Sequence, residues 1–153
     1  MNTIIVEEGE DNGDRILVGD NTDWKGIYNP PSRKLGKSTN QGEKTEVALI
    51  LGGGGTARAA AYAATQLGLE RIYYNRTPSK DLLADMFGGT VVNTLDEIDG
   101  DGESSLSEVL HSINGQVQVV ISTLPAAAEF ELPSWLVGLV ANDTGKKPIV
   151  FDV

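Results

Sequence analysis

Four consecutive glycines begin at Gly52, between an apolar run at residues 47–51 and an alanine-rich segment at residues 56–67. The apolar run predicts a buried strand, and the alanine-rich segment predicts a helix packed close behind it. The spacing fits the pattern Gly-x-Gly-x-x-Ala, in which Gly52 would make a tight turn, Gly54 would let the backbone approach a diphosphate, and Ala57 would let helix and strand touch. Because a helix start offers unpaired amides and partial positive charge to phosphates, we predict a dinucleotide site here.

The end of the next predicted strand, residues 71–75, indicates which dinucleotide binds. A cofactor with a free ribose 2′-hydroxyl calls for an Asp or Glu at this point, and the chain has none. The side chains present suit a ribose 2′-phosphate instead: Asn75, Arg76, Thr77 and the nearby Lys80. We therefore predict NADP rather than NAD. Two alternatives stay open, since Thr77 could cap the following helix and Lys80 could be an ordinary solvated lysine.

Composition limits the classes of function. The 153 residues suit one domain, and 12 basic against 22 acidic side chains give a net charge of −10. This charge disfavours binding to nucleic acid or to anionic membranes, so any phosphate must be held locally. The absence of cysteine excludes disulfides, thiolate metal sites and cysteine nucleophiles. No signal peptide or long apolar segment is recognisable, which predicts a cytoplasmic protein.

The elements that would position these residues alternate along most of the chain. From residue 46 onward, strand and helix patterns follow one another, which predicts right-handed parallel crossovers. The expected fold class is α/β, a Rossmann-like parallel sheet with helices on both faces. Two short strands at residues 4–6 and 15–18 predict a separate β-hairpin ahead of this sheet. A short helix should follow the hairpin and stop at Pro30-Pro31.

Three other features have simple structural explanations. The acidic, glycine-rich stretch at residues 96–105 does not match a calcium loop, so we expect an exposed loop and no metal. His111, the only histidine, stands near the end of a predicted helix, where a cation interacts favourably with the helix dipole. Trp24 and Trp135 are expected to be packing residues.

A further motif at residues 19–26, Gly-Asp-Asn-Thr-Asp-Trp-Lys-Gly, precedes the glycine loop and the triplet Asn75-Arg76-Thr77. These three motifs, in this order, resemble those of shikimate dehydrogenases, which reduce 3-dehydroshikimate with NADPH. The resemblance spans nearly the whole chain. The tryptophan after the aspartate looks most like the fungal forms, which include the shikimate dehydrogenase domain of the pentafunctional arom protein and its non-catalytic relative in the fungal quinate-pathway repressor.

The resemblance implies a role for each matching residue. Asn2 and Asp23 correspond to substrate-binding residues, and Asp23 also to the aspartate that pairs with the family's catalytic lysine. The pyrophosphate loop corresponds to Gly52, Gly54, Gly55, Thr56 and Ala57. The adenosine-phosphate clamp corresponds to Asn75, Arg76, Thr77 and Lys80. The segment along the ribose and nicotinamide corresponds to Ser122, Thr123 and Leu124.

The resemblance also implies a domain organisation. Residues 1–27 would be a hairpin and motif left from the substrate domain, residues 28–45 a connector, and residues 46–153 a Rossmann-like dinucleotide-binding domain, with the chain truncated at both ends. The family's substrate domain supplies paired serines and the lysine that handles the proton, and this region is missing here. Since loss of general acid catalysis alone costs about 10²- to 10⁴-fold in rate, we expect the isolated chain to bind NADP without turnover.

Three functions remain open at this point. The chain could be the NADP-binding module of a shikimate or quinate dehydrogenase, partnered by a shikimate-pathway or quinate-pathway ligand and by the other domains of a larger parent chain. It could instead be a non-catalytic sensor domain of a repressor, which would then be nuclear but would not itself contact nucleic acid. A fold that serves only as an interaction surface is the third possibility. A homodimer is possible under each.

Overall fold

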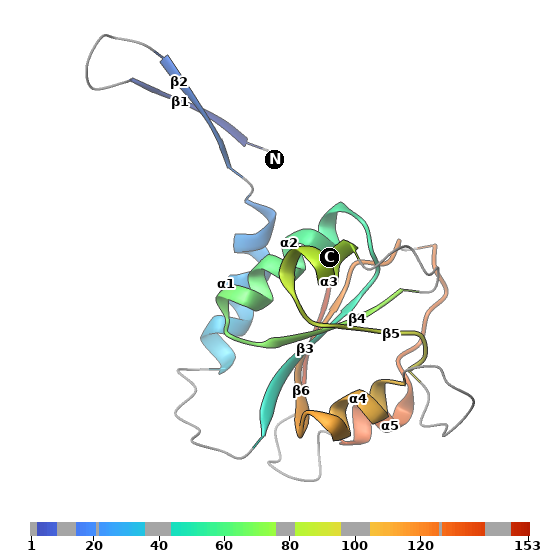
Figure 1. Ribbon diagram of the computed structural model, residues 1–153. Coiled ribbons are helices and arrows are strands. Elements are labelled where there is room, and N and C mark those ends of the chain that lie inside the picture. Colours follow the sequence, from blue (N-terminus) through green and yellow to red (C-terminus); the bar gives the residue numbers. More distant parts are fainter. Residues whose placement is uncertain are drawn as a thin grey trace.

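A computed structural model describes residues 3–8, 15–20, 22–35, 44–75, 82–95, 105–125, 127–139 and 148–153. Strands β1 (Thr3–Glu8) and β2 (Arg15–Asp20) form a two-stranded antiparallel hairpin, in register from Thr3 opposite Asp20 to Glu8 opposite Arg15. The hairpin projects away from the remaining elements (Figure 1). The separate hairpin predicted from the sequence is therefore present.

The second sheet has five parallel strands in the order β5-β4-β3-β6-β7. Its members are β3 (Thr45–Leu51), β4 (Glu70–Tyr74), β5 (Thr90–Val92), β6 (Gly115–Ser122) and β7 (Ile149–Asp152). The chain runs outward from β3 to β5 and then returns across β3 to β6. Strand order therefore reverses between β3 and β6, and ligands of open α/β sheets bind outside the carboxyl ends of the strands at such a point.

Helices cover both faces of this sheet, as the alternating pattern predicted. Helices α1 (Asp23–Leu35), α2 (Gly55–Gln66) and α3 (Leu82–Phe87) contribute to one apolar cluster, and α4 (Leu106–Ser112) and α5 (Ser134–Leu139) to another (Figure 1). Alternate residues of β3 supply the two clusters, with Ala48 and Ile50 in the first and Val47 and Leu49 in the second. A strand buried on both faces explains the continuous apolar run that the sequence shows.

The expectation that Pro30-Pro31 would end the first helix is wrong, because α1 continues to Leu35. Each proline removes one helical hydrogen bond. Ile27 and Pro31 are nevertheless buried one turn apart, and Leu35 packs against the same apolar cluster. Burial of this stripe, at about 1.5–3 kcal/mol for each fully buried large apolar side chain, offsets the lost hydrogen bonds. The first part of the expected connector is consequently helical.

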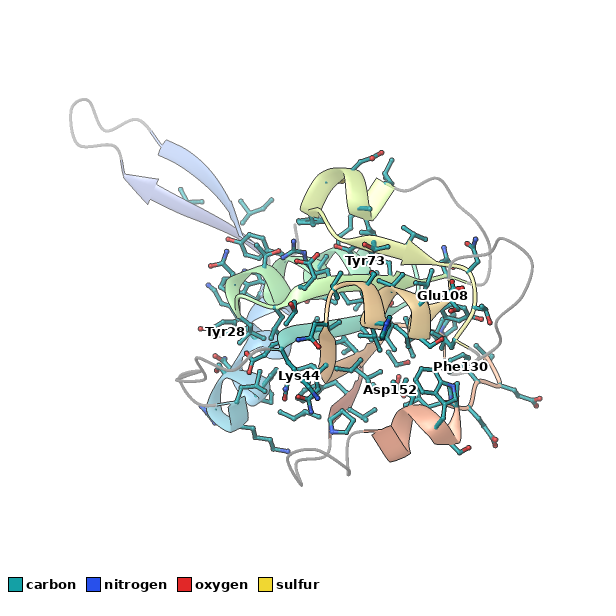
Figure 2. The ribbon with its side chains drawn as sticks, turned by 60° about the horizontal axis from the view of Figure 1, so that its bottom comes forward. Tyr28, Lys44, Tyr73, Glu108, Phe130 and Asp152 are labelled. Carbon is teal, nitrogen blue, oxygen red and sulfur yellow. The ribbon has the colours of Figure 1, made fainter. Side chains whose placement is uncertain are left out.

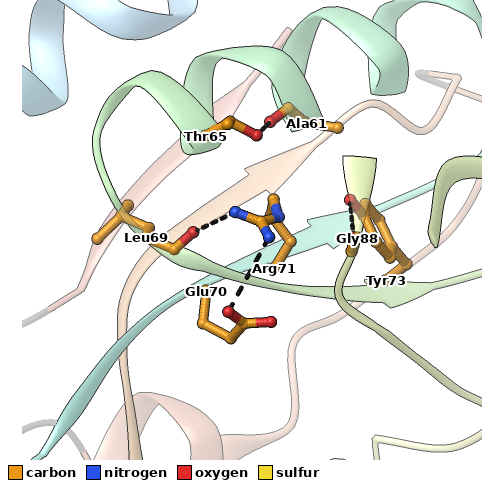
Figure 3. A network of polar contacts seen from close by, with 7 residues as sticks. All are labelled: Ala61, Thr65, Leu69, Glu70, Arg71, Tyr73 and Gly88. Atoms are coloured by element: carbon orange, nitrogen blue, oxygen red, sulfur yellow. Dashed lines mark hydrogen bonds and ion pairs between the residues drawn. The ribbon is translucent and has the colours of Figure 1, made fainter. Parts of the chain in front are cut away.

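Two polar side chains of β4 donate hydrogen bonds to backbone carbonyls outside the strand: Tyr73 to the turn after α3, and Arg71 to the residue before β4. The Tyr73 hydroxyl donates to the Gly88 carbonyl at 2.9 Å, and the Arg71 guanidinium donates to the Leu69 carbonyl at 3.0 Å (Figure 3). Gly89 adopts a φ of +103°, and a Cβ there would overlap the Arg71 carbonyl. Burial raises the pKa of Tyr73 to about 12, an effect that the nearby positive charge of Arg71 opposes.

Candidate functional site

The turn after β3 requires a glycine at position 52. Gly52 has a φ of +109°, which side chains of L-residues rarely adopt. A Cβ at this position would lie 2.5 Å from the Thr123 Oγ1 and 3.4 Å from the Thr123 carbonyl oxygen. The first glycine of the loop therefore makes the tight turn that its spacing predicted, and it also allows the β3 and β6 ends to meet.

Backbone hydrogen bonds tie the carboxyl ends of neighbouring strands together. The Gly52 amide donates to the Tyr74 carbonyl at 2.9 Å, which joins β3 to β4. The Thr123 amide and hydroxyl both donate to the Leu51 carbonyl, at 2.9 Å and 2.8 Å, which joins β6 to β3. The residue after β4, Asn75, follows directly on Tyr74. The strand order thus brings three predicted segments, widely separated in sequence, to one edge of the sheet.

The start of α2 is open toward this edge. Gly54 is the N-cap, with an extended backbone (φ −81°, ψ −167°) and no side chain to cap the amides. The Arg58 amide makes a helical bond, to the Gly54 carbonyl at 3.4 Å, and amides in the first turn of a helix have no partner within it. A Cβ built at Gly54 or Gly55 meets no atom within 4 Å, and both glycines are exposed. Neither glycine therefore obstructs the approach of a ligand to the helix start.

Small side chains allow α2 to lie close to the sheet. Six alanines of this helix are buried: Ala57, Ala59, Ala60, Ala61, Ala63 and Ala64. They share one apolar cluster with Ala48 and Ile50 of β3 and with Val119 and Ile121 of β6. The close helix–strand approach predicted from Ala57 is confirmed, and it holds the α2 start at the end of β3.

The segment expected to lie along the ribose and nicotinamide ends β6 and begins the loop after it. Ser122 and Thr123 are half-buried, and Leu124 packs against the apolar cluster that contains residues of α4 and α5. Because the Thr123 hydroxyl donates to a backbone carbonyl, its hydrogen is engaged within the chain and its lone pairs remain available as acceptors. The contact of Thr123 with Gly52 could not be seen in the sequence.

Only one member of the adenosine-phosphate clamp lies among the described residues. Asn75 is half-buried at the end of β4, next to the glycine turn. Arg76, Thr77 and Lys80 lie outside the described residues, and so does Asn2. Their roles remain predictions from the sequence and the resemblance.

Asp23 is the first residue of α1 and is exposed. The next residue, Trp24, packs edge-on against Tyr62 of α2, with ring centroids 5.1 Å apart, and against Tyr28 at 5.9 Å. The Lys25 ammonium lies 5.8 Å from the centroid of the Trp24 ring. Trp24 is thus a packing residue, as predicted, and it fixes the first turn of α1 on the second helix. The packing role of Tyr62 was not predicted, because it depends on the contact with Trp24 of another helix.

A second aromatic pair lies at the carboxyl end of β4, on the opposite face of the sheet from Tyr73. The Tyr74 and Phe130 rings have centroids 6.0 Å apart and pack on the cluster that contains Leu136. Tyr73 and Phe130, both labelled in Figure 2, belong to the clusters on opposite faces of the sheet. Phe130 stands in an irregular segment, where no periodicity in the sequence indicated it. The Trp135 indole nitrogen, on the same cluster, is buried and has no hydrogen-bond partner among the residues that the structure describes.

The remaining predictions concern His111, the acidic stretch and membrane-spanning segments. His111 lies in the last turn of α4, as expected, and is exposed. Across the described ranges no group of three His, Asp or Glu side chains could hold a metal ion, and most of the acidic stretch lies outside those ranges. Among the helices that the structure describes, none is long and apolar enough to span a membrane.

Comparison with known proteins finds pentafunctional AROM polypeptides of several organisms. The chain is 36% identical over 135 residues to the pentafunctional AROM polypeptide of Schizosaccharomyces pombe, a match over 84% of this chain. It is 39% identical over 107 residues to that of Komagataella phaffii, a match over 66% of this chain. These matches cover only 8% and 6% of the two relatives, so the chain corresponds to a small segment of each.

A solved structure with a similar arrangement is the shikimate 5-dehydrogenase of Thermus thermophilus in complex with shikimate. It shares 28% sequence identity and a TM-score of 0.48, over 78% of this chain and 38% of that one. No protein-family model matches the chain.

Proposed function

Because this chain is a homologue of a segment of the fungal pentafunctional AROM polypeptides, we propose that it is the NADP-binding part of a shikimate dehydrogenase-type protein. The resemblance found in its motifs is thereby confirmed. The observation that supports the cofactor is the open, uncapped start of α2 beside the Gly52 turn, at the point where strand order reverses. These relatives give no support to the repressor alternative.

The described residues fit a bound dinucleotide phosphate. The amides at the α2 start would hold the diphosphate, since a helix N-terminus favours negative charge. Gly54 and Gly55 leave space for its oxygens. Asn75 and the three predicted residues after it would hold the ribose 2′-phosphate. Ser122, Thr123 and Leu124 would line the nicotinamide half, and the bound cofactor would supply or accept a hydride there.

The substrate side of the reaction needs more than this chain. Asp23, held beside α2 through Trp24, would hydrogen-bond a hydroxyl of a shikimate-type substrate. The hairpin and the motif at residues 19–26 would belong with a substrate domain, and residues 46–153 with the cofactor domain. The proton donor and the rest of the substrate site would come from other domains of a larger cytoplasmic parent chain. The isolated chain would bind cofactor without turnover.

Calorimetric titration of the chain with NADP and with NAD tests this function. We expect NADP to bind more tightly than NAD, and Arg76→Ala to weaken NADP binding about tenfold with little effect on NAD, because a guanidinium–phosphate contact is lost. The matched control is Arg33→Ala, which removes one positive charge from the last turn of α1. Equal affinity for the two cofactors, or an unchanged preference in Arg76→Ala, would overturn the NADP assignment.

A further inference from the structure

Arg58 is an exposed cation in the first full turn of α2, and nothing in the motif analysis assigns it a role. It follows Gly54 by four residues, and its amide donates to the Gly54 carbonyl. Within the described part of the chain its side chain makes no hydrogen bond or ion pair.

The position of Arg58 is unfavourable for the helix alone. The first turn of α2 contains no acidic residue, so the positive end of the helix dipole is uncompensated. A cation near that end raises the local positive potential further and destabilises the helix. An anion bound at the helix start would interact favourably both with the helix dipole and with the Arg58 charge.

Helix geometry directs the Arg58 side chain toward the α2 start. Side chains in a helix tilt toward its N-terminus, and an arginine is long enough to cover the preceding turn. That turn contains Gly54 and Gly55, whose Cα atoms face open space. The space beside these two glycines is therefore open to a long side chain.

The neighbours of α2 indicate which phosphate Arg58 would meet. Tyr62 lies one turn beyond Arg58 on the same exposed stripe and contacts Trp24 of α1. Arg58 therefore faces the α1 side. The segment that carries Arg76 leads from β4 to α3, and α3 flanks α2 as well. Figure 1 shows α1 and α3 on opposite sides of α2, so Arg58, on the α1 side, is placed away from the α3 side, where the residues after β4 are expected to hold the 2′-phosphate.

We propose that Arg58 is a further cofactor-binding residue that contacts the diphosphate of a bound dinucleotide from the α1 side. This inference rests on the proposed cofactor function. It assigns two arginines to two phosphate groups: Arg58 to the diphosphate that NAD and NADP share, and Arg76 to the 2′-phosphate that only NADP carries. Arg58 would set affinity for both cofactors, and Arg76 would set the choice between them.

The experiment is a titration of NADP and of NAD into the wild-type chain, Arg58→Ala, Arg58→Lys and the charge-matched control Arg33→Ala. We expect Arg58→Ala to weaken both cofactors about tenfold and to leave their ratio unchanged. Arg58→Lys should recover part of the loss, because a lysine keeps the charge without the two-pronged hydrogen bonding. Arg33→Ala should bind as the wild type does. A thermal unfolding midpoint equal to that of the wild type would show that each variant is folded.

Two results would overturn the proposal while leaving the cofactor function intact. Arg58→Ala could bind both cofactors as tightly as Arg33→Ala does, which would make Arg58 a solvated residue. It could also lose affinity for NADP alone, which would place it at the 2′-phosphate. A wild-type chain that bound neither cofactor would instead refute the proposed function itself, and this inference with it.

Discussion

Single residues at the strand ends determine whether the glycine loop can form. Gly52 combines a positive φ with a close approach to Thr123, so two independent constraints exclude a side chain. The sequence motif predicted the first constraint, because the spacing of glycines and alanine indicates a tight turn. It could not predict the second, because 71 positions separate the two residues and only the folded sheet brings them together.

The Gly52→Ala variant should be destabilised by about 1–3 kcal/mol, from the strained φ and the overlap of its Cβ with the Thr123 hydroxyl. Denaturant unfolding would measure this change. Gly55→Ala is the control, since a Cβ there meets no neighbour and a helical backbone accepts alanine well. Its unfolding free energy should stay within about 0.5 kcal/mol of the wild type. Equal effects in the two variants would refute the steric argument.

Tyr73 should make stability depend on alkaline pH. Its pKa is about 12 in the folded chain and 10.0 unperturbed, so the unfolded chain loses this proton first. The contribution to stability is present below pH 10 and declines as pH rises toward 12, by up to about 2–3 kcal/mol. Unfolding free energies of the wild type and Tyr73→Phe, measured across pH 9–11.5, would show a steeper decline in the wild type. Parallel curves would contradict the assignment.

Among the elements, α1 best shows how tertiary packing overrides local signals. Two adjacent prolines predict a helix end, yet the helix persists because its buried stripe continues to Leu35. The alternating strands and helices of the remaining chain were predictable, because each pattern is local. The pairing of Trp24 with Tyr62 was not, because their contact depends on how α1 lies across α2.

Removal of the Trp24–Tyr62 contact should loosen α1 from α2. A double-mutant cycle with Trp24→Ala and Tyr62→Ala should give a coupling free energy of about 0.5–1.5 kcal/mol, the usual range for an edge-to-face aromatic pair. Thermal or denaturant unfolding of the four proteins would measure it. A cycle of Trp24→Ala with the distant Phe130→Ala, on the opposite face of the sheet, is the control and should show additive effects. Coupling of equal size in both cycles would argue against a direct contact.

At the scale of the whole molecule, the hairpin and the parallel sheet differ in what stabilises them. The sheet has two apolar clusters, one on each face. The hairpin has two strands, and the Ile4 and Val6 side chains of β1 are 61% and 55% exposed. Isolated two-stranded hairpins are marginal in water. The hairpin and the parallel sheet are therefore two regions of one chain with very different local stability.

Hydrogen exchange should reveal this difference directly. Amides of β1 and β2 should exchange within seconds to minutes at neutral pH, whereas those of β3 should exchange only with sub-global or global opening. Mass spectrometry of peptides from residues 3–20 and 45–51 would measure both rates. Protection of the hairpin equal to that of β3 would contradict the prediction. If that protection rose with protein concentration, it would come from pairing between copies of the chain; if it did not, the hairpin would be stable within one copy.

The double hydrogen bond from Thr123 to the Leu51 carbonyl has a consequence for the thermodynamics of ligand capture. It locks the loop after β6 to the base of the glycine turn before any dinucleotide arrives. This part of the crevice is preorganised, so an arriving ligand meets groups already held in place and orders little additional backbone. The entropic penalty of recognition should therefore fall mainly on the ligand and on the long side chains that close over its phosphates.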